Sequence, residues 1–232
     1  MVPSAMDEIR HCSFSARLDC HYLLRSPLAF DSEAFLILTL HGFSSNPEVM
    51  LGLTAGMFGP RHVIASLQGP NQFFLSTTNP EVGYGWATNR HPASSIRLHH
   101  EMVLHVLDEA GREYGVPRDR RVLVGFSQPV SFNYRFAATH PAAIRGVVGL
   151  CGGMPSDWET ADYQPVSASV LHIARRADGY YPPTVTERYP ERLRARCRDV
   201  EFHLLDGGHQ FPSKGGPIAE QFLSRLRTPD RR

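Results

Sequence analysis

The segment from Val122 to Gln128, which reads Val-Leu-Val-Gly-Phe-Ser-Gln, constrains this chain more than any other. An apolar, mostly β-branched run reaches Gly125, Ser127 follows two residues later, and a helix-like stretch comes next. This pattern is typical of a sharp strand-to-helix turn that exposes a serine hydroxyl above the edge of a sheet. In such a turn the N–H of Gln128 points at whatever the serine attacks. We therefore predict that Ser127 is a nucleophile.

Strand and helix signals alternate along the rest of the chain. Apolar or alternating runs predict strands at 14–24, 34–40, 62–67, 121–126, 145–150, 169–174 and 200–205. Helical patterns lie at 94–114, 130–140, 185–197 and 217–226. Alternating strands and helices predict an α/β fold with a mostly parallel, doubly wound sheet and helices on both faces.

Size and charge narrow the class of protein. With 232 residues, of which 42% are hydrophobic, we expect one domain over 1–232, a core at about 12–227, and no large lid domain. A net charge of +1 gives no reason to expect a nucleic-acid partner. The longest apolar run, at 34–40, is too short to span a membrane. The first ten residues include Asp7 and Glu8 and lack the apolar core of a signal peptide.

The four cysteines lack the spacing of a metal or redox site: Cys12, Cys20, Cys151 and Cys197. We expect free thiols in a reducing cytoplasm, and neither a metal nor a cofactor. A bridge between Cys12 and Cys20 is the alternative for an exported chain.

A serine hydroxyl is a poor nucleophile at neutral pH and needs a base, which in turn needs an orienting group. In a doubly wound sheet, groups at the carboxyl ends of the strands come together. His209 follows the predicted strand at 200–205, after two glycines that permit a tight turn. His99, His100 and His105 lie on a predicted helix and are interpreted as surface or partly buried helix residues, while three histidines within strands are interpreted as structural: His21, His172 and His203. We predict that His209 is the base.

Asp178, which follows the predicted strand at 169–174, is the predicted orienting acid. Asp157 is an alternative, because an acid after the preceding strand reaches the same region. Asp206 is another, although it would have to curl back over the Gly-Gly turn. The order Ser, Asp, His along the chain is that of the α/β-hydrolases.

An oxyanion hole needs two preorganised N–H donors. The N–H of Gln128 is the first. The second is expected from the loop after the strand at 34–40, where Gly42 lets the backbone approach a substrate; Phe43 is the predicted donor and Ser44 the next choice.

Position 129 holds proline where the G-x-S-x-G pattern has glycine. Proline is tolerated in the first turn of a helix, but it restricts the residue before it, which is Gln128. We expect a slightly displaced helix and an oxyanion hole that is tight or somewhat detuned.

With these motifs the chain resembles the α/β-hydrolase superfamily, and within it the phospholipase/carboxylesterase group, which includes acyl-protein thioesterases. The resemblance spans roughly 34–212 and is carried by His41-Gly42-Phe43, Gln68-Gly69-Pro70, Gly85-Trp86, Gly125-Phe126-Ser127-Gln128, Asp178 and Gly208-His209. It implies a triad of Ser127, Asp178 and His209, an oxyanion hole from Phe43 and Gln128, and hydrolysis of short or medium acyl esters or thioesters without a cofactor.

Aromatic residues in the segment 68–92 are expected to form one wall of a substrate pocket: Phe73, Phe74 and Trp86. The other side is expected from Met154, Tyr180 and Tyr181. The loop holds one acid and one base, which favours an uncharged small-molecule ester as the substrate of a monomer or homodimer. The alternatives are a thioesterase or lysophospholipase, a lactone or peptide hydrolase, and a catalytically silent binding protein on the same fold.

Overall fold

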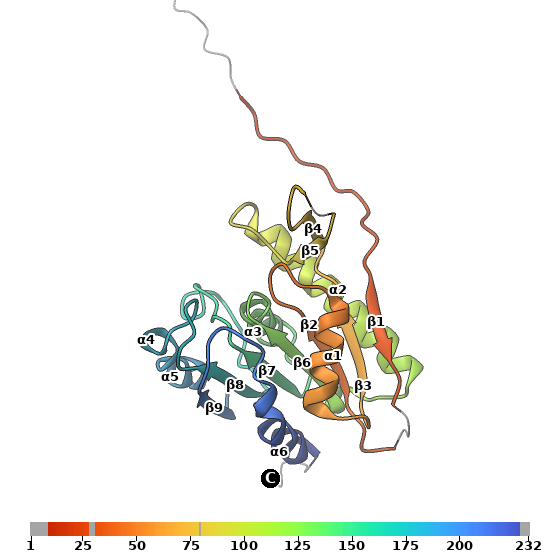
Figure 1. Cartoon of the computed structure of the whole chain (residues 1–232), viewed down its shortest axis with the longest axis vertical. Coiled ribbons are helices and arrows are strands. Elements are labelled where there is room, and N and C mark those ends of the chain that lie inside the picture. The colour runs from red at the N-terminus through yellow and green to blue at the C-terminus, as the bar shows by residue number, and fades with distance from the viewer. Residues whose placement is uncertain (1–8, 28–30, 79, 228–232) are drawn as a thin grey trace, which may run out of the picture.

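The computed structural model describes residues 9–27, 31–78 and 80–227. A seven-stranded sheet lies at its centre, with the strand order β1-β3-β2-β6-β7-β8-β9 (Figure 1). Its strands are β1 (Tyr22–Arg25), β2 (Leu36–Leu40), β3 (Val63–Leu67), β6 (Arg121–Phe126), β7 (Gly146–Leu150), β8 (Ser169–Arg175) and β9 (Val200–Leu205). The edge strand β1 pairs antiparallel with β3, and the other pairs in this sheet are parallel. The predicted, mostly parallel sheet is confirmed.

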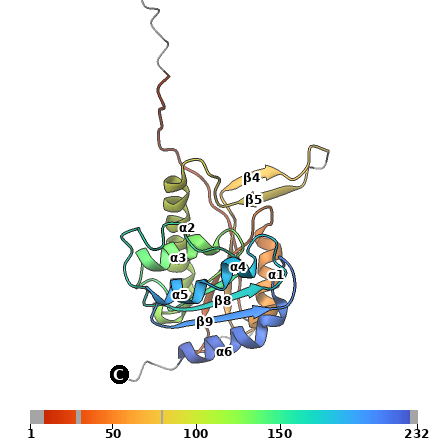
Figure 2. The same ribbon diagram turned by 90° about the vertical axis from the view of Figure 1, so that its left-hand side faces the viewer.

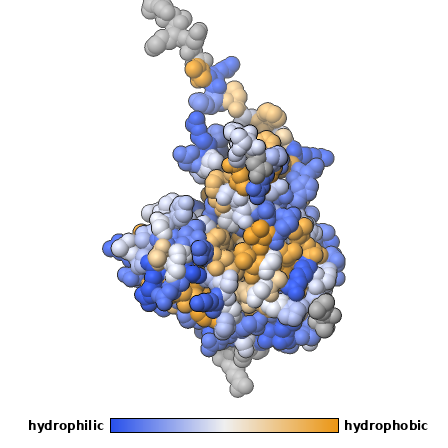
Figure 3. Space-filling view, in the orientation of Figure 1, coloured by the Kyte–Doolittle hydropathy of each residue, from blue (hydrophilic) through white to orange (hydrophobic). Residues whose placement is uncertain are grey.

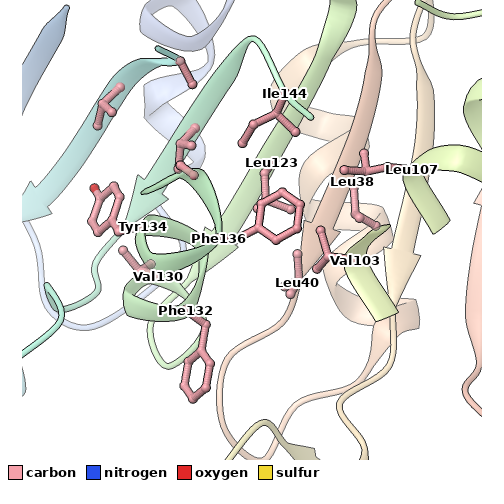
Figure 4. Close-up of a cluster of buried hydrophobic side chains, with 14 of the residues drawn as sticks. Leu38, Leu40, Val103, Leu107, Leu123, Val130, Phe132, Tyr134, Phe136 and Ile144 are labelled. Carbon is pink, nitrogen blue, oxygen red and sulfur yellow. The ribbon is translucent and has the colours of Figure 1, made fainter. Parts of the chain in front are cut away.

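Helices cover both faces of the sheet, as predicted. They are α1 (Pro47–Phe58), α2 (Pro92–Glu113), α3 (Val130–Thr139), α4 (Pro183–Thr186), α5 (Tyr189–Arg194) and α6 (Gly216–Arg227), with short 3-10 turns η1 (Arg118–Arg120) and η2 (Ser213–Gly215). One apolar cluster joins the sheet to α2, α3 and α5, and a second joins it to α1 and α6. Figure 4 shows part of the first cluster, where Phe136 of α3 lies beside Leu123 of β6. No helix in the described ranges is long and apolar enough to cross a membrane.

The central strands are mostly apolar because helices cover both of their sides. Every residue of β2, β3 and β7 is buried. Their carboxyl ends meet at one edge of the sheet, so that the loops that follow β2, β6, β7, β8 and β9 are neighbours there.

The N-terminal strand is shorter than predicted. A strand was expected over 14–24, but pairing begins at Tyr22, opposite Leu67 at the end of β3. The carbonyl of His21 still accepts the Gln68 N–H at 3.0 Å, but residues 9–21 form no strand or helix.

The helix predicted over 185–197 is interrupted and forms α4 and α5 instead. Pro190 explains the break, since it has no N–H to donate to the preceding turn.

The helix α1 was not predicted. Its side chains are apolar around most of its circumference, and Val49 remains 50% exposed. Figure 3 shows apolar surface over α1. Without a polar face, the segment has none of the contrast by which a helix is predicted.

The segment 68–92, predicted as a loop, contains a two-stranded hairpin of β4 (Asn71–Phe74) and β5 (Val82–Gly85). The hairpin projects from the body of the molecule (Figure 2). A bridge between Ser45 and Tyr84 ties it to the loop after β2. This hairpin is the largest addition to the α/β core in the described ranges, which contain no lid domain.

Candidate active site

Ser127, Asp178 and His209 come from the loops after β6, β8 and β9 and lie in contact. His209 Nε2 is 2.9 Å from Ser127 Oγ, and His209 Nδ1 is 2.8 Å from Asp178 Oδ2. The Asp178 side chain is fully buried, while that of His209 is 18% exposed. The imidazole therefore bridges a buried carboxylate and a hydroxyl at the edge of the sheet.

Ser127 adopts a backbone conformation that residues other than glycine rarely adopt. Its φ is 63°, in the left-handed region, directly between β6 and α3. The Ser127 N–H donates to Leu150 O at 2.8 Å, which fixes the turn to the neighbouring strand β7. A strained residue at this junction, held by its surroundings, has the geometry of the predicted strand-to-helix turn.

Gly207 shapes the turn that carries His209 over the sheet. Its φ is 126°, a backbone conformation that residues with a side chain rarely adopt, so the position favours glycine. The His209 ring then stacks on Phe126, with centroids 5.3 Å apart. The glycine and the aromatic contact together orient the imidazole.

The carboxylate of Asp178 is held by the backbone that follows it. Its Oδ1 accepts hydrogen bonds from the N–H groups of Tyr180 and Tyr181, at 2.8 and 2.9 Å. The two alternative acids have other partners. Asp157 binds Arg135 at 2.7 Å, and the exposed Asp206 lies 3.2 Å from Arg176.

The loop after β2 approaches Ser127 closely at Gly42. A Cβ on Gly42 would lie 3.0 Å from Phe126 Cδ1, which is tighter than ordinary contact. The N–H of Ser44 donates to Tyr84 O at 2.9 Å, so this group, the second choice for the oxyanion hole, is already committed. Phe43 stays the predicted donor of this loop.

His41 holds the same loop from below. It is fully buried, and burial lowers the pKa of its imidazole. Its Nε2 accepts from the Gly69 N–H at 2.9 Å, while Nδ1 lies 2.7 Å from Gly42 O. An imidazole that accepts through Nε2 has its proton on Nδ1, which then donates to the Gly42 carbonyl. This role was not foreseen from the sequence, where His41 was only part of a motif.

The side chain of Gln128 fastens the hairpin to the serine turn. Its Oε1 accepts from the Trp86 N–H at 2.9 Å, and its Nε2 donates to Ala87 O at 2.8 Å. The sequence analysis gave Gln128 a role through its backbone alone, because a side-chain contact 42 positions away leaves no local signal.

Of the three aromatic residues expected in one pocket wall, Phe73 contacts the loop after β2. Its ring stacks on that of Phe43, with centroids 5.0 Å apart. Phe74 is 70% exposed and, as the next residue of the same strand, points to the opposite face of the hairpin. Trp86 is 1% exposed, and its indole N–H donates to His41 O, so the prediction that Trp86 lines an open pocket is wrong. Its side chain packs beneath the loop instead.

On the other side of the site, Tyr180 is 78% exposed and its ring lies 4.7 Å from that of His209. Met154 is half-buried and packs against the core cluster beneath α3. Its loop passes close to Ser127, since a Cβ on the neighbouring Gly152 would lie 2.5 Å from Ser127 O.

Pro129 has φ of −74°, which a proline ring adopts without strain, and its carbonyl accepts the N–H of Asn133 at 2.9 Å. The residue therefore fits at the start of α3, as expected for a proline in a first helical turn.

The four cysteines are free. Within the described residues, no cluster of three or more His, Cys, Asp or Glu side chains suited to a metal ion is found.

The chain resembles known proteins in two ways. Residues 83–227 match the model of a family described as phospholipase/carboxylesterase. Among solved structures, a carboxylesterase from Bacillus cereus matches with 18% identity and a TM-score of 0.69, over 89% of this chain and 94% of that one. A carboxylesterase from Mesorhizobium loti matches with 18% identity and a TM-score of 0.68, over 91% and 98%. SOBER1 from Arabidopsis thaliana has 16% identity and a TM-score of 0.68, over 84% and 100%. No curated protein sequence matches significantly.

The sheet, the helices on both of its faces and the arrangement of the strand ends define an α/β-hydrolase fold. The chain belongs to the phospholipase/carboxylesterase family, whose model covers more than half of it. Family membership makes it a hydrolase that acts on esters, and confirms the resemblance stated from the sequence.

Proposed function

We propose that this protein hydrolyses carboxylic esters of short to medium acyl chain length through an acyl-enzyme on Ser127. The observation that carries the proposal is the position of His209, which contacts Ser127 Oγ at 2.9 Å and Asp178 Oδ2 at 2.8 Å. A base within hydrogen-bond reach of a hydroxyl, itself oriented by a carboxylate, is the arrangement that activates a serine.

In the proposed mechanism Ser127 Oγ attacks the ester carbonyl while His209 Nε2 takes its proton. The Asp178 carboxylate accepts the Nδ1 hydrogen bond and stabilises the imidazolium. The N–H groups of Phe43 and Gln128 bind the developing oxyanion. His209 then protonates the leaving alcohol, and a water molecule repeats the sequence on the acyl-enzyme.

The surroundings of Ser127 favour an uncharged acyl group. Phe43 and Phe73 stack on one side, and Tyr180 lies over His209 on the other. The protein is proposed to act in the cytoplasm, since all four of its cysteines are free thiols. It is further proposed to be a monomer or homodimer. We propose no metal, cofactor or nucleic-acid partner.

A panel of p-nitrophenyl esters from acetate to dodecanoate tests this function. We expect turnover that is highest for short or medium chains and falls for long ones. The Ser127→Ala variant should lose at least about a thousandfold in kcat, as expected when a triad nucleophile is removed. Unchanged turnover in Ser127→Ala, or none in the wild type with any ester, would refute the proposal.

A further inference from the structure

Tyr181 lies on the side of Ser127 that faces away from the expected oxyanion hole. In the sheet, β6 has β2 as its neighbour on one side and β7, followed by β8, on the other. The loop after β2 carries Phe43, whereas the loop after β8 carries Tyr181. The two loops therefore flank Ser127 from opposite directions.

The contacts of Tyr181 fix its ring within the site. Its backbone N–H donates to Asp178 Oδ1 at 2.9 Å, and its ring centroid lies 5.8 Å from that of His209. The position of Gly153 makes room for the ring, since a Cβ there would lie 2.9 Å from Tyr181 Cε1. Tyr181 is half-buried, in contrast to the adjacent Tyr180, which is 78% exposed.

The phenol of Tyr181 reaches the serine itself. Its hydroxyl lies close enough to the Ser127 side chain to affect the pKa of the phenol. Burial raises the pKa of Tyr181, the Asp178 charge raises it further, and the Ser127 contact opposes both. A phenol with a raised pKa stays protonated at neutral pH, so the group at this position is a hydrogen-bond donor.

We propose that Tyr181 is a further catalytic residue, whose hydroxyl donates a hydrogen bond to the leaving-group oxygen of the ester. This inference rests on the proposed function of Ser127 and His209. The Tyr181 ring lies beside His209, with centroids 5.8 Å apart, on the side of Ser127 opposite the loop that carries Phe43. Once Oγ is bonded to the acyl carbon, the nearest oxygen on the same side is that of the leaving group, which must also face His209 to receive its proton.

The step requires no additional reactant. As the tetrahedral intermediate collapses, the bond between the acyl carbon and the leaving-group oxygen breaks, and its electron pair goes to that oxygen. The proton on His209 Nε2 moves to the same oxygen, which leaves as the alcohol. Tyr181 keeps its own proton throughout and stabilises the negative charge that develops before proton transfer is complete.

The test compares two esters of the same acyl group, a p-nitrophenyl ester and an ethyl ester, in wild type and Tyr181→Phe. The quantity measured is kcat/KM, because it reports acylation for both esters. An ethoxide leaving group carries more charge on oxygen than a nitrophenolate, so it depends more on a donor. For Tyr181→Phe we expect a loss of about three- to tenfold with the ethyl ester, within the range of one neutral hydrogen bond, and less than about twofold with the p-nitrophenyl ester.

Tyr163→Phe is the matched control, since it removes a hydroxyl that donates to Asp157 outside the site; it should leave the ratio of the two rates unchanged. Equal losses with both esters in Tyr181→Phe, or no loss with either, would overturn the proposed role of Tyr181. If wild type hydrolyses neither ester and a fluorophosphonate does not label it, the proposed function itself fails. The labelling result therefore separates the two failures.

Discussion

The carboxylate of Asp178 meets His209 Nδ1 at 2.8 Å from a fully buried position. Asp178→Asn keeps the shape of the side chain, and its amide oxygen can still accept from the backbone. The amide has an NH2 donor in place of one of the two carboxylate oxygens that accept hydrogen bonds. It also has no negative charge to stabilise the imidazolium. We predict that steady-state ester hydrolysis falls by about a thousandfold to ten-thousandfold in kcat, as in triads whose aspartate is replaced by asparagine.

Asp157→Asn is the control for that variant, because Asp157 was the alternative acid and binds Arg135 instead. Its kcat should stay within about twofold of wild type, because Asp157 binds Arg135 and Tyr163 and none of the three triad residues. A large loss in Asp157→Asn together with a small one in Asp178→Asn would reverse the assignment.

The Gly42→Ala variant tests whether the loop after β2 supplies a donor to the oxyanion hole. The Cβ of Gly42→Ala would meet Phe126 Cδ1 at 3.0 Å and the Phe126 carbonyl oxygen at 3.4 Å, which pushes the loop and the Phe43 N–H away from Ser127. We predict a loss of about tenfold to a hundredfold in kcat, less than the loss of a complete oxyanion donor. Gly52→Ala in α1 is the matched control, as a Cβ there meets nothing within 4 Å. Equal kcat values in the two variants would argue against the role of the loop.

The Pro129→Gly variant is expected to affect activity and stability differently. If proline restricts Gln128 and detunes the oxyanion hole, Pro129→Gly should keep or raise kcat/KM. The same variant should unfold more easily by about 0.4–1 kcal/mol, because proline at a compatible φ lowers the entropy of the unfolded chain. Ester kinetics and urea titration measure the two effects. A large loss of kcat/KM in the glycine variant would contradict the detuning.

Buried histidines predict how stability depends on pH. Burial lowers the pKa of His172 and of His100 to about 3, and that of His62 to about 4. In the unfolded chain each takes up a proton near pH 6.5, so the unfolded state binds more protons between about pH 6.5 and 4. The free energy of unfolding should therefore be greatest above pH 6.5 and fall as the pH is lowered.

His172→Phe isolates one of these groups. The variant loses the hydrogen bond between His172 Nδ1 and the Tyr134 hydroxyl, so it starts less stable at pH 7.5. Below pH 6.5, its free energy of unfolding should fall less steeply than that of wild type, by about 1.4 kcal/mol per pH unit. Urea titrations at pH 7.5, 6.0 and 5.0 measure the slopes, and parallel slopes would count against a neutral, buried His172.

The elements predicted best are those with the strongest local pattern. The strands predicted at 121–126 and 200–205 have the same bounds in the structure. The first is a nearly continuous apolar run in the middle of the sheet, whereas the second, at the edge, alternates apolar residues with Glu201 and His203. The helix α1 has no contrast between an apolar and a polar face, although the Asn46 side chain caps it by accepting from the Val49 N–H and Pro47 is its first residue. The Asn-Pro pair was the signal available to predict it.

The residues of the site also differ in whether the sequence allows their roles to be predicted. Ser127, Asp178 and His209 each follow a strand, and the topology of a parallel sheet brings strand ends together, so their proximity was predictable. The side-chain roles of Gln128 and His41 depend on how the hairpin folds back across the strand ends. The burial of Trp86 has the same origin, since its indole binds the backbone of His41 beneath the loop. No sequence pattern encodes these contacts.

The central claim is that His209 makes Ser127 a nucleophile, and covalent labelling tests it most directly. Wild type, Ser127→Ala and His209→Gln would be incubated with a fluorophosphonate at neutral pH, followed by mass spectrometry of the intact protein and its peptides. We predict one adduct on Ser127 in wild type, none in Ser127→Ala, and labelling slowed by at least about a hundredfold in His209→Gln, since general-base catalysis contributes that much or more. Absence of an adduct in wild type, or an adduct on another residue, would contradict the account.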